Sequence, residues 1–212
     1  MKINAYIATL PERRDMLSKT MHSLLPQVDG VHVRIGTDSM GDANKFYYAD
    51  SFDGYVFLCD DDLYYPPDYV EYMISKIEQY NRKYVISLHG RTFLKDKIES
   101  YYTGKQNRVF CLLQNDKDRL MQICGTGVTA FHSDTVSLSM NDFKSRNMAD
   151  VWFAMACERQ GIGRMVVESP LGYLESFKPE NSIARSMRDN DQKQIEAVNS
   201  IEWKTYKIGQ LV

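Results

Sequence analysis

Residues 55–68 read Tyr-Val-Phe-Leu-Cys-Asp-Asp-Asp-Leu-Tyr-Tyr-Pro-Pro-Asp, an apolar run that ends in three adjacent carboxylates. The run predicts a buried strand, and the two prolines after it separate that strand from a helical pattern. A strand that crosses a core and stops in carboxylates places them at the carboxyl edge of a sheet, where open α/β sheets bind ligands. This stretch therefore predicts an α/β fold with a binding site at that edge.

The three carboxylates, Asp60, Asp61 and Asp62, form a candidate cation site. Side chains alternate along an extended segment, so we expect Asp60 and Asp62 to point one way and Asp61 the other. Two convergent carboxylates need a positive charge, and oxygen ligands suit Mg²⁺ or Mn²⁺, which usually take one or two carboxylates plus substrate phosphates. A solvated acidic loop is the alternative interpretation. The position at the end of an apolar strand favours a metal-bound nucleotide diphosphate.

The sequence on either side of the triplet predicts alternating strands and helices. Residues 3–8 and 31–35 read as strands, and residues 17–25 carry one apolar helical face between them. After the triplet, the pattern from Asp68 is helical, and residues 84–88 form another expected strand. Because β-α-β units build parallel sheets, we expect a mostly parallel sheet.

The later part of the chain has a mixed pattern. Residues 92–107 are polar and irregular, which indicates a loop or a hairpin. The elements expected after them are two β-rich runs that form a ribbon, a helix, a short strand and a tail helix, at 108–114, 122–132, 149–160, 164–168 and 191–201.

The composition is compatible with this interpretation. The chain has 212 residues, 43% apolar and 25% charged, and its net charge of −2 argues against a dedicated nucleic-acid surface. Its four cysteines show no C-x-x-C spacing, and no segment has the length of a signal peptide or a membrane span, so we expect a cytoplasmic protein. We expect one domain, with a first half at 1–91, a second half at 92–170 and a tail at 171–212.

Three motifs together resemble bacterial family 2 glycosyltransferases of the GT-A fold. They are the strand ending in Asp-Asp-Asp, the Tyr-Tyr-Pro-Pro-Asp-Tyr sequence at 64–69, and Met-Ala-Asp-Val-Trp-Phe at 148–153. The resemblance spans residues 3–170 and is stronger in its first half. It implies a three-layer α/β/α sandwich, a UDP-sugar donor bound over the first half, an acceptor bound across the second, and Mn²⁺ or Mg²⁺ as cofactor.

The resemblance also implies roles for single residues. Asp60 matches the carboxylate that hydrogen-bonds the donor's ribose, and Asp62 matches the one that holds the divalent cation on the diphosphate. Asp38 matches the acid that contacts uracil, and Asp150 matches the catalytic base of inverting members. Further positions that match the nucleotide-binding loops are Ala8, Thr9, Glu12, Arg14 and Lys45.

The remaining ligands of the metal are left open. Asp60 is a second candidate ligand beside Asp62, and His132 is a third, although a lone histidine at a strand end is more often structural. Many GT-A enzymes place a metal-binding histidine after the base, and no histidine follows Asp150 here. Water, the diphosphate or Asp61 is left to complete the metal shell.

Several candidate residues have a structural alternative. Asp150 opens an expected helix, so it is either a base stabilised by the helix dipole or an ordinary N-cap. Arg91 follows an expected strand and either binds a phosphate or is a solvated residue of a turn. Residues 125–127, Gly-Thr-Gly, are too short for a phosphate loop, and a contact with the donor sugar or the acceptor is left open for them. Three tail cations are assigned to a solvated face rather than to the diphosphate: Lys178, Arg185 and Arg188.

The function expected from the sequence is transfer of a sugar from a UDP-sugar to an acceptor hydroxyl, with inversion and with Asp150 as base. The acceptor is a saccharide or another hydroxyl-bearing molecule, and a nucleic-acid acceptor is not excluded. A non-catalytic nucleotide-sugar-binding domain is the alternative. A sugar nucleotidyltransferase is less favoured, because Thr-Leu-Pro-Glu-Arg-Arg at 9–14 replaces the glycine-rich loop of that class.

Overall fold

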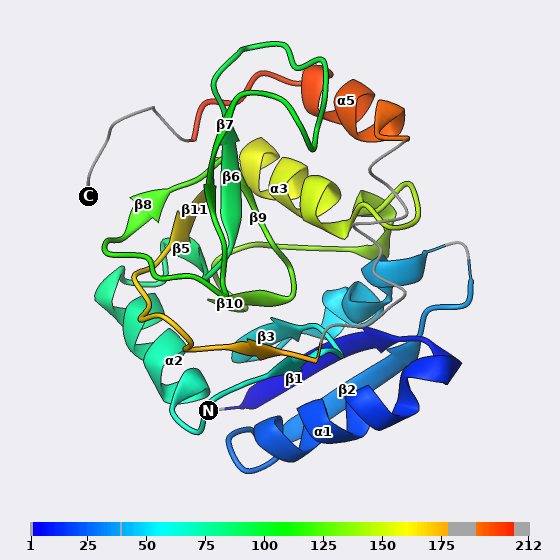
Figure 1. Cartoon of the computed structure of the whole chain (residues 1–212), viewed down its shortest axis with the longest axis vertical. Helices are drawn as coiled ribbons and strands as arrows, with labels where there is room; N and C mark the ends of the chain where they lie inside the picture. The colour runs from blue at the N-terminus through cyan, green and yellow to red at the C-terminus, as the bar shows by residue number, and fades with distance from the viewer. Residues whose placement is uncertain (1, 39, 178–189, 206–212) are drawn as a thin grey trace.

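The computed structural model describes residues 2–38, 40–177 and 190–205. Within these residues seven strands form a central sheet, in the order β2-β1-β3-β10-β5-β11-β8 (Figure 1). Strands β2, β1, β3, β5 and β11 run in one direction, and β10 and β8 run in the other. The expected mostly parallel sheet is confirmed. The strand bounds are β1 Ile3–Thr9, β2 Gly30–Ile35, β3 Tyr55–Cys59, β5 Tyr84–Ser87, β8 Arg119–Leu120, β10 Val128–His132 and β11 Gly163–Val166.

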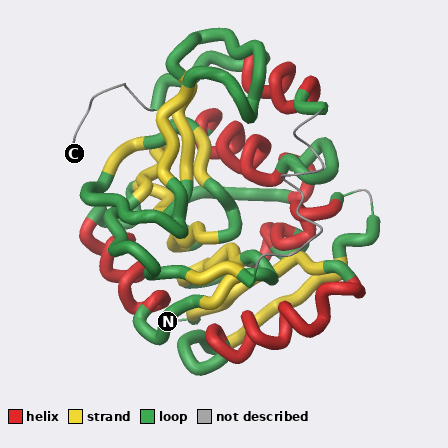
Figure 2. Tube along the Cα trace, in the orientation of Figure 1, coloured by secondary structure: helices red, strands yellow, loops and turns green. Residues whose placement is uncertain are grey.

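Helices pack on both faces of this sheet. α1 (Arg14–Leu24) and α2 (Tyr69–Gln79) lie on one face, and α3 (Ala149–Arg159) lies on the other (Figure 2). Side chains alternate along β3, so Phe57 is buried with the first two helices and Leu58 with α3. The described chain is therefore an α/β fold with helices on both faces of the sheet.

The apolar pattern after the triplet forms α2 as expected. Val70, Met73 and Ile77 are buried at helical spacing against the sheet. The helix begins directly after the two prolines, which cannot continue a preceding strand. It therefore starts at the carboxyl edge of the sheet, beside the acidic triplet.

The expected β-ribbon pairs differently from the prediction. β6 (Gly90–Phe93) and β7 (Gln106–Val109) form a hairpin, and β9 (Ile123–Cys124) pairs with the other edge of β6. The run expected at 122–132 is thus divided between β9 in this small sheet and β10 in the central sheet. Gly127 lies at the division, where a Cβ would stand 2.0 Å from Asp60 Oδ2. The backbone must pass this carboxylate closely, so the strand is interrupted there.

The other described elements are short. β4 (Leu63–Tyr64) pairs with β12 (Glu175–Ser176), and α5 (Gln192–Asn199) packs on α3 through an apolar cluster. The 3₁₀ helices are η1 Pro11–Arg13, η2 Gly41–Phe46, η3 Ala49–Ser51 and η4 Met140–Asp142. Among the described helices, none has the length and apolarity needed to cross a membrane.

Candidate functional site

Asp61 joins the ends of the first and third strands. Thr9 closes β1, and its Oγ1 donates a hydrogen bond to Asp61 Oδ2 at 2.6 Å. Arg13 Nη1 donates to Asp61 Oδ1, also at 2.6 Å. Burial raises the pKa of Asp61 above its ordinary value, and the bond from Thr9 and the charge of Arg13 oppose that shift. Asp61 is thus a buried connection between the two strand ends.

The three carboxylates do not divide as strand alternation predicts. Arg13 Nη2 lies 3.5 Å from Asp62 Oδ2, so Asp61 and Asp62 share one guanidinium. Asp60 instead pairs with Lys45. The reason is that β3 ends at Cys59 and the chain turns at 61–62, which removes the two-residue period of a strand.

Arg13, which the sequence analysis assigned no role, contacts the triplet, whereas its predicted neighbours Glu12 and Arg14 do not. Glu12 is exposed in η1, and Arg14 lines a groove on the outer face of α1 together with Leu17 and Tyr64. The 3₁₀ turn before α1 aims residue 13 toward the carboxylates. The run of two arginines signalled a cation here, but its spacing could not decide which of them points inward.

Lys45 is a buried ammonium between Asp60 and the segment that follows the small sheet. Its Nζ donates to Asp60 Oδ1 at 2.7 Å and to the Thr126 carbonyl at 3.3 Å. Burial alone lowers the pKa of Lys45, but the charge and hydrogen bond of Asp60 raise it above the ordinary value. The Asp60 side chain is 49% exposed, so a ligand can reach the carboxylate that Lys45 holds.

Asp150 faces the same segment from the other side. The Thr126 backbone N–H and Oγ1 both donate to Asp150 Oδ1, at 2.8 and 2.7 Å. Among the described residues, none hydrogen-bonds the second oxygen, Oδ2. The N-cap position of α3 is Met148, so the N-cap alternative for Asp150 is not what the structure has. Asp150 is held in place on one oxygen and open on the other.

The helix terminus is capped by a residue that the sequence did not identify. Asp42 Oδ2 accepts a hydrogen bond from Ala149 N at 3.2 Å, across 107 positions of sequence. Burial raises the pKa of Asp42 to about 7, Lys45 opposes this, and Asp150 adds to it. Its Oδ1 is buried and has no hydrogen-bond partner among the described residues. Nothing in the local pattern distinguishes Asp42 from the other acids near it, because its partners are distant in sequence.

The carboxylates at this edge outnumber the cations that they contact. Burial first, and then the charge of Asp60, raise the pKa of Asp62 to about 7. Within the described residues, no three His, Cys, Asp or Glu side chains are placed together to hold a metal. Two carboxylates, Asp60 and Asp62, with a diphosphate completing the shell, fit the usual mode of Mg²⁺ binding. An added cation would also offset the charge that their burial leaves uncompensated.

His132 is not placed with these carboxylates. It lies opposite Tyr55 at the start of β3, whereas Val128 lies opposite Cys59 at the end of that strand. Its ring nitrogens contact Arg82 Nη1 at 3.2 Å and the Asp134 carboxylate, also at 3.2 Å. The expected contribution of His132 to the metal is therefore wrong, because β10 runs antiparallel and carries this side chain to the opposite edge of the sheet.

Arg91 lies in β6 of the small sheet, and His89 directly precedes that strand. Arg91 Nη1 donates to the Tyr101 carbonyl at 2.9 Å, and its guanidinium lies 4.2 Å from the centre of the Tyr101 ring. It is a strand residue of β6 rather than the turn residue considered above. Burial lowers the pKa of His89 to about 4, opposed by the charge of Asp150, so its imidazole is neutral near pH 7. His89 is a neighbour of Asp150 that the sequence analysis assigned no role.

The other expected positions lie along the same strand edge. Ala8 is half-buried near the end of β1. Asp38 is exposed and accepts hydrogen bonds from Met40 N at 2.9 Å and Asn44 Nδ2 at 2.8 Å, and the bond from Asn44 is the main cause of its lowered pKa. The tail cations Lys178, Arg185 and Arg188 lie outside the described residues.

No family model and no curated protein sequence matches this chain. Among solved structures, the chain is similar to the crystal structure of A197 from STIV, with a TM-score of 0.45 and 17% sequence identity, over 83% of this chain and 84% of that one. A likeness of this size supports no functional conclusion. The chemistry of the site must be argued from its own residues.

Proposed function

We propose that this protein is a metal-dependent glycosyltransferase of the GT-A type, which moves a sugar from a UDP-sugar to an acceptor hydroxyl with inversion. The position of Thr126 carries the proposal. Its carbonyl accepts from Lys45, which holds Asp60, while its N–H and hydroxyl hold Asp150. The donor-side carboxylate and the candidate base thus lie on two sides of one residue, which is the juxtaposition that sugar transfer needs.

The donor side of the site is suited to a nucleotide diphosphate. Asp60 and Asp62 are the residues that would hold the divalent cation, and the ion pair with Lys45 holds the Asp60 carboxylate in place. The cation, when bound, neutralises the charge of the departing diphosphate and so stabilises the transition state. Thr9 and Asp38 lie at the ends of β1 and β2, where the nucleoside would bind at the carboxyl edge of the sheet.

The acceptor side requires one group that takes a proton. Asp150 is oriented by two hydrogen bonds to Oδ1, which leaves Oδ2 to accept the proton of the attacking hydroxyl. The neutral imidazole of His89 forms no ion pair that would compete for this carboxylate. These features support catalysis over the binding of a nucleotide-sugar alone.

A donor screen tests the proposal. We expect UDP release from at least one member of a UDP-sugar panel in Mn²⁺ or Mg²⁺, and none in EDTA. Asp62→Ala should remove the metal-dependent release, with a loss of at least about 10²-fold. The matched control is Asp134→Ala, which changes an exposed carboxylate at the opposite edge of the sheet. Equal UDP release in EDTA would contradict the metal requirement. Binding of UDP without release from any donor would favour the alternative of a non-catalytic nucleotide-sugar-binding domain.

A further inference from the structure

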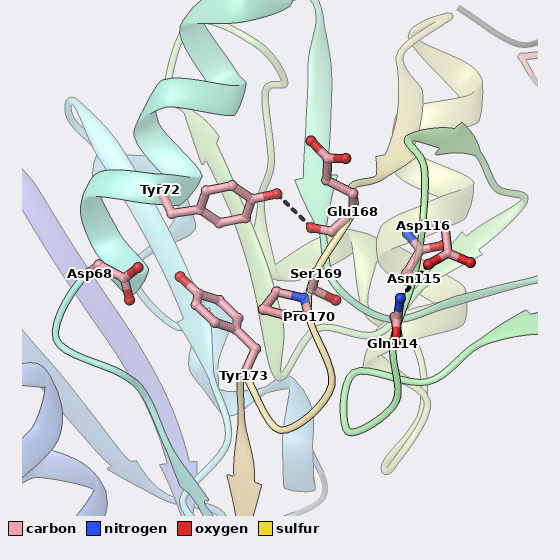
Figure 3. Close-up of a pocket in the computed structure, with 9 residues that line it drawn as sticks. All are labelled: Asp68, Tyr72, Gln114, Asn115, Asp116, Glu168, Ser169, Pro170 and Tyr173. Carbon is pink, nitrogen blue, oxygen red and sulfur yellow. Dashed lines mark hydrogen bonds between the residues drawn. The ribbon is translucent and has the colours of Figure 1, made fainter.

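A cavity lies at the same edge of the sheet, outside the proposed donor site. It has a volume of about 470 Å³ and opens between the start of α2, residues 114–116 and residues 168–173 (Figure 3). This volume lies within the range of small-molecule sites in proteins. None of the residues discussed above for the donor or the base lines it. The cavity therefore needs its own explanation.

The wall of this cavity combines aromatic rings with hydrogen-bonding groups. The rings of Tyr72 and Tyr173 pack edge to face, with centres 5.6 Å apart. Carboxylates from three different segments, those of Asp68, Asp116 and Glu168, line the same cavity (Figure 3). An apolar ring surface beside several hydrogen-bond acceptors matches a pyranose, which has hydroxyls around its rim and C–H groups on its faces.

One buried hydroxyl in the cavity wall lacks a partner. Ser169 is 4% exposed, and its Oγ has no hydrogen-bond partner among the described residues. The backbone of Ser169 is fixed by two hydrogen bonds with Asn115, so the side chain is held at the wall. A buried polar atom without a partner is costly and needs an explanation. A hydroxyl of a bound ligand would supply the missing hydrogen bond.

Two of the three carboxylates of the cavity already contact a donor group of the protein. Lys76 Nζ lies 3.0 Å from Glu168 Oε1, and the Gln114 amide donates to Asp116 Oδ1 at 2.6 Å. After burial, the charge of Asp68 is the main cause that raises the pKa of Tyr173, so this phenol stays protonated and able to donate. The cavity thus offers carboxylate acceptors together with a phenol donor, and the hydroxyls of a sugar can bond to both kinds of group.

A short segment connects the cavity to the donor site. Residues 114–116 line the cavity, and Cys111 lies a few residues before them. Cys111 packs on the core cluster that contains Cys59 and Leu63, the residues on either side of the triplet. The segment therefore passes from the cavity toward the triplet. One ligand chain could therefore reach from the cavity toward the reacting groups.

We propose that this cavity binds a pyranose unit of a saccharide acceptor, away from the hydroxyl that reacts. The choice of acceptor rests on the proposed function, whereas the binding itself needs neither nucleotide nor metal. A distal subsite of this kind would select acceptors by chain length and by the sugar bound in the cavity.

Binding of free oligosaccharides to the full chain tests the proposal. The probes are neutral linear tetrasaccharides of glucose, galactose, mannose and N-acetylglucosamine, measured by saturation-transfer NMR and titration calorimetry without UDP or metal. We expect at least one to bind. Tyr173→Ala should weaken the binding of that oligosaccharide about fivefold or more, and so should Asp116→Asn, which changes an exposed side chain of the cavity. The control is Leu171→Ala, which is 69% exposed on the same loop and does not line the cavity.

The possible outcomes separate this inference from the proposed function. No binding by any probe, or equal binding to both cavity variants and the wild type, would overturn the inference. UDP release without acceptor should be unchanged in Asp116→Asn. If oligosaccharide binds in the cavity and no UDP-sugar is consumed, the proposed function fails and the sugar site remains.

Discussion

The two ends of β3 carry opposite kinds of charge network. At its start, Tyr55 and Arg82 both hydrogen-bond Glu78 at 2.6 Å, and the bond from Arg82 is the main cause that lowers the pKa of Glu78. At its end, burial raises the pKa of Asp62 to about 7. One network stabilises the charges that it contains, and the other buries carboxylates without enough cations. Charge left uncompensated at a sheet edge indicates a binding site, whereas satisfied charge indicates a structural one.

The largest effect that would sharpen this comparison concerns Asp150. Asp150→Asn keeps the size of the side chain and its hydrogen bond from Thr126 but removes the proton acceptor. We expect sugar transfer to fall by about 10³-fold, the usual scale for a general base, while calorimetry shows unchanged UDP affinity. Transfer at the wild-type rate would reduce Asp150 to a structural partner of Thr126.

The next effect concerns the buried cation at the acidic end. Lys45→Met removes the partner of Asp60, and we expect the free energy of unfolding in urea at pH 7 to fall by about 2 kcal/mol, discounted because Asp60 is half exposed. The control is Lys2→Met, whose pair with Asp53 is exposed and should contribute less than about 0.5 kcal/mol. Equal losses in the two variants would mean that burial does not distinguish the pairs.

A pH dependence should follow from Asp42. Folding raises its pKa from an ordinary 3.8 to about 7, so between these values the folded state binds the proton more tightly than the unfolded chain. The stability from this group is therefore complete below about pH 4 and lost as the pH rises toward 7. Asp42→Asn keeps an oxygen for Ala149 N and removes the charge. We expect it to stabilise the metal-free protein by about 1 kcal/mol at pH 8 and to do little at pH 4.

Urea unfolding at the two pH values, with EDTA present, measures this difference. The matched variant is Asp134→Asn, which removes a carboxylate at the opposite edge and should leave the difference between pH 4 and pH 8 as in the wild type. Destabilisation by Asp42→Asn at pH 8 would show instead that the charged carboxylate is needed to cap α3.

The smallest effect is expected at the start of β3, where the charges are paired. Glu78→Gln disrupts an ion pair on the surface of α2, and we expect a loss of less than about 1 kcal/mol. UDP release should stay at the wild-type rate, because this residue lies at the opposite edge of the sheet. A tenfold loss of release would show that the two ends of β3 are coupled.

Local pattern predicted the elements that surround the site. The apolar run at 55–59, the helical spacing after Asp68 and the early β-α-β unit all depend on neighbours within a few residues, and the structure has each of them. The prediction paired the two β-rich runs with each other, whereas in the structure β7 and β9 both pair with β6. β6 begins directly after His89, in a stretch that the sequence did not mark as part of the ribbon. Strand pairing depends on residues far apart in sequence, which periodicity does not report.

For the candidate site, too, local motifs identified some residues, whereas others were missed or misplaced. Asp60, Asp62, Lys45 and Asp150 were found from motifs, and the structure brings Lys45 to Asp60 and Asp150 to Thr126. Arg13 was missed in favour of its neighbour, and His132 was included although it lies at the other edge. Which of two adjacent arginines faces inward is decided by a 3₁₀ turn, and that turn has no signal beyond one proline.

The sequence by itself determined where the buried strand ends and that its end is acidic, because hydrophobic periodicity and chain-breaking residues act locally. Only the tertiary structure decided which charges are paired, which stay uncompensated, and that Asp42 caps the helix of Asp150. Those properties arise from burial and from contacts between loops about a hundred residues apart, and both exist only after the layers have packed.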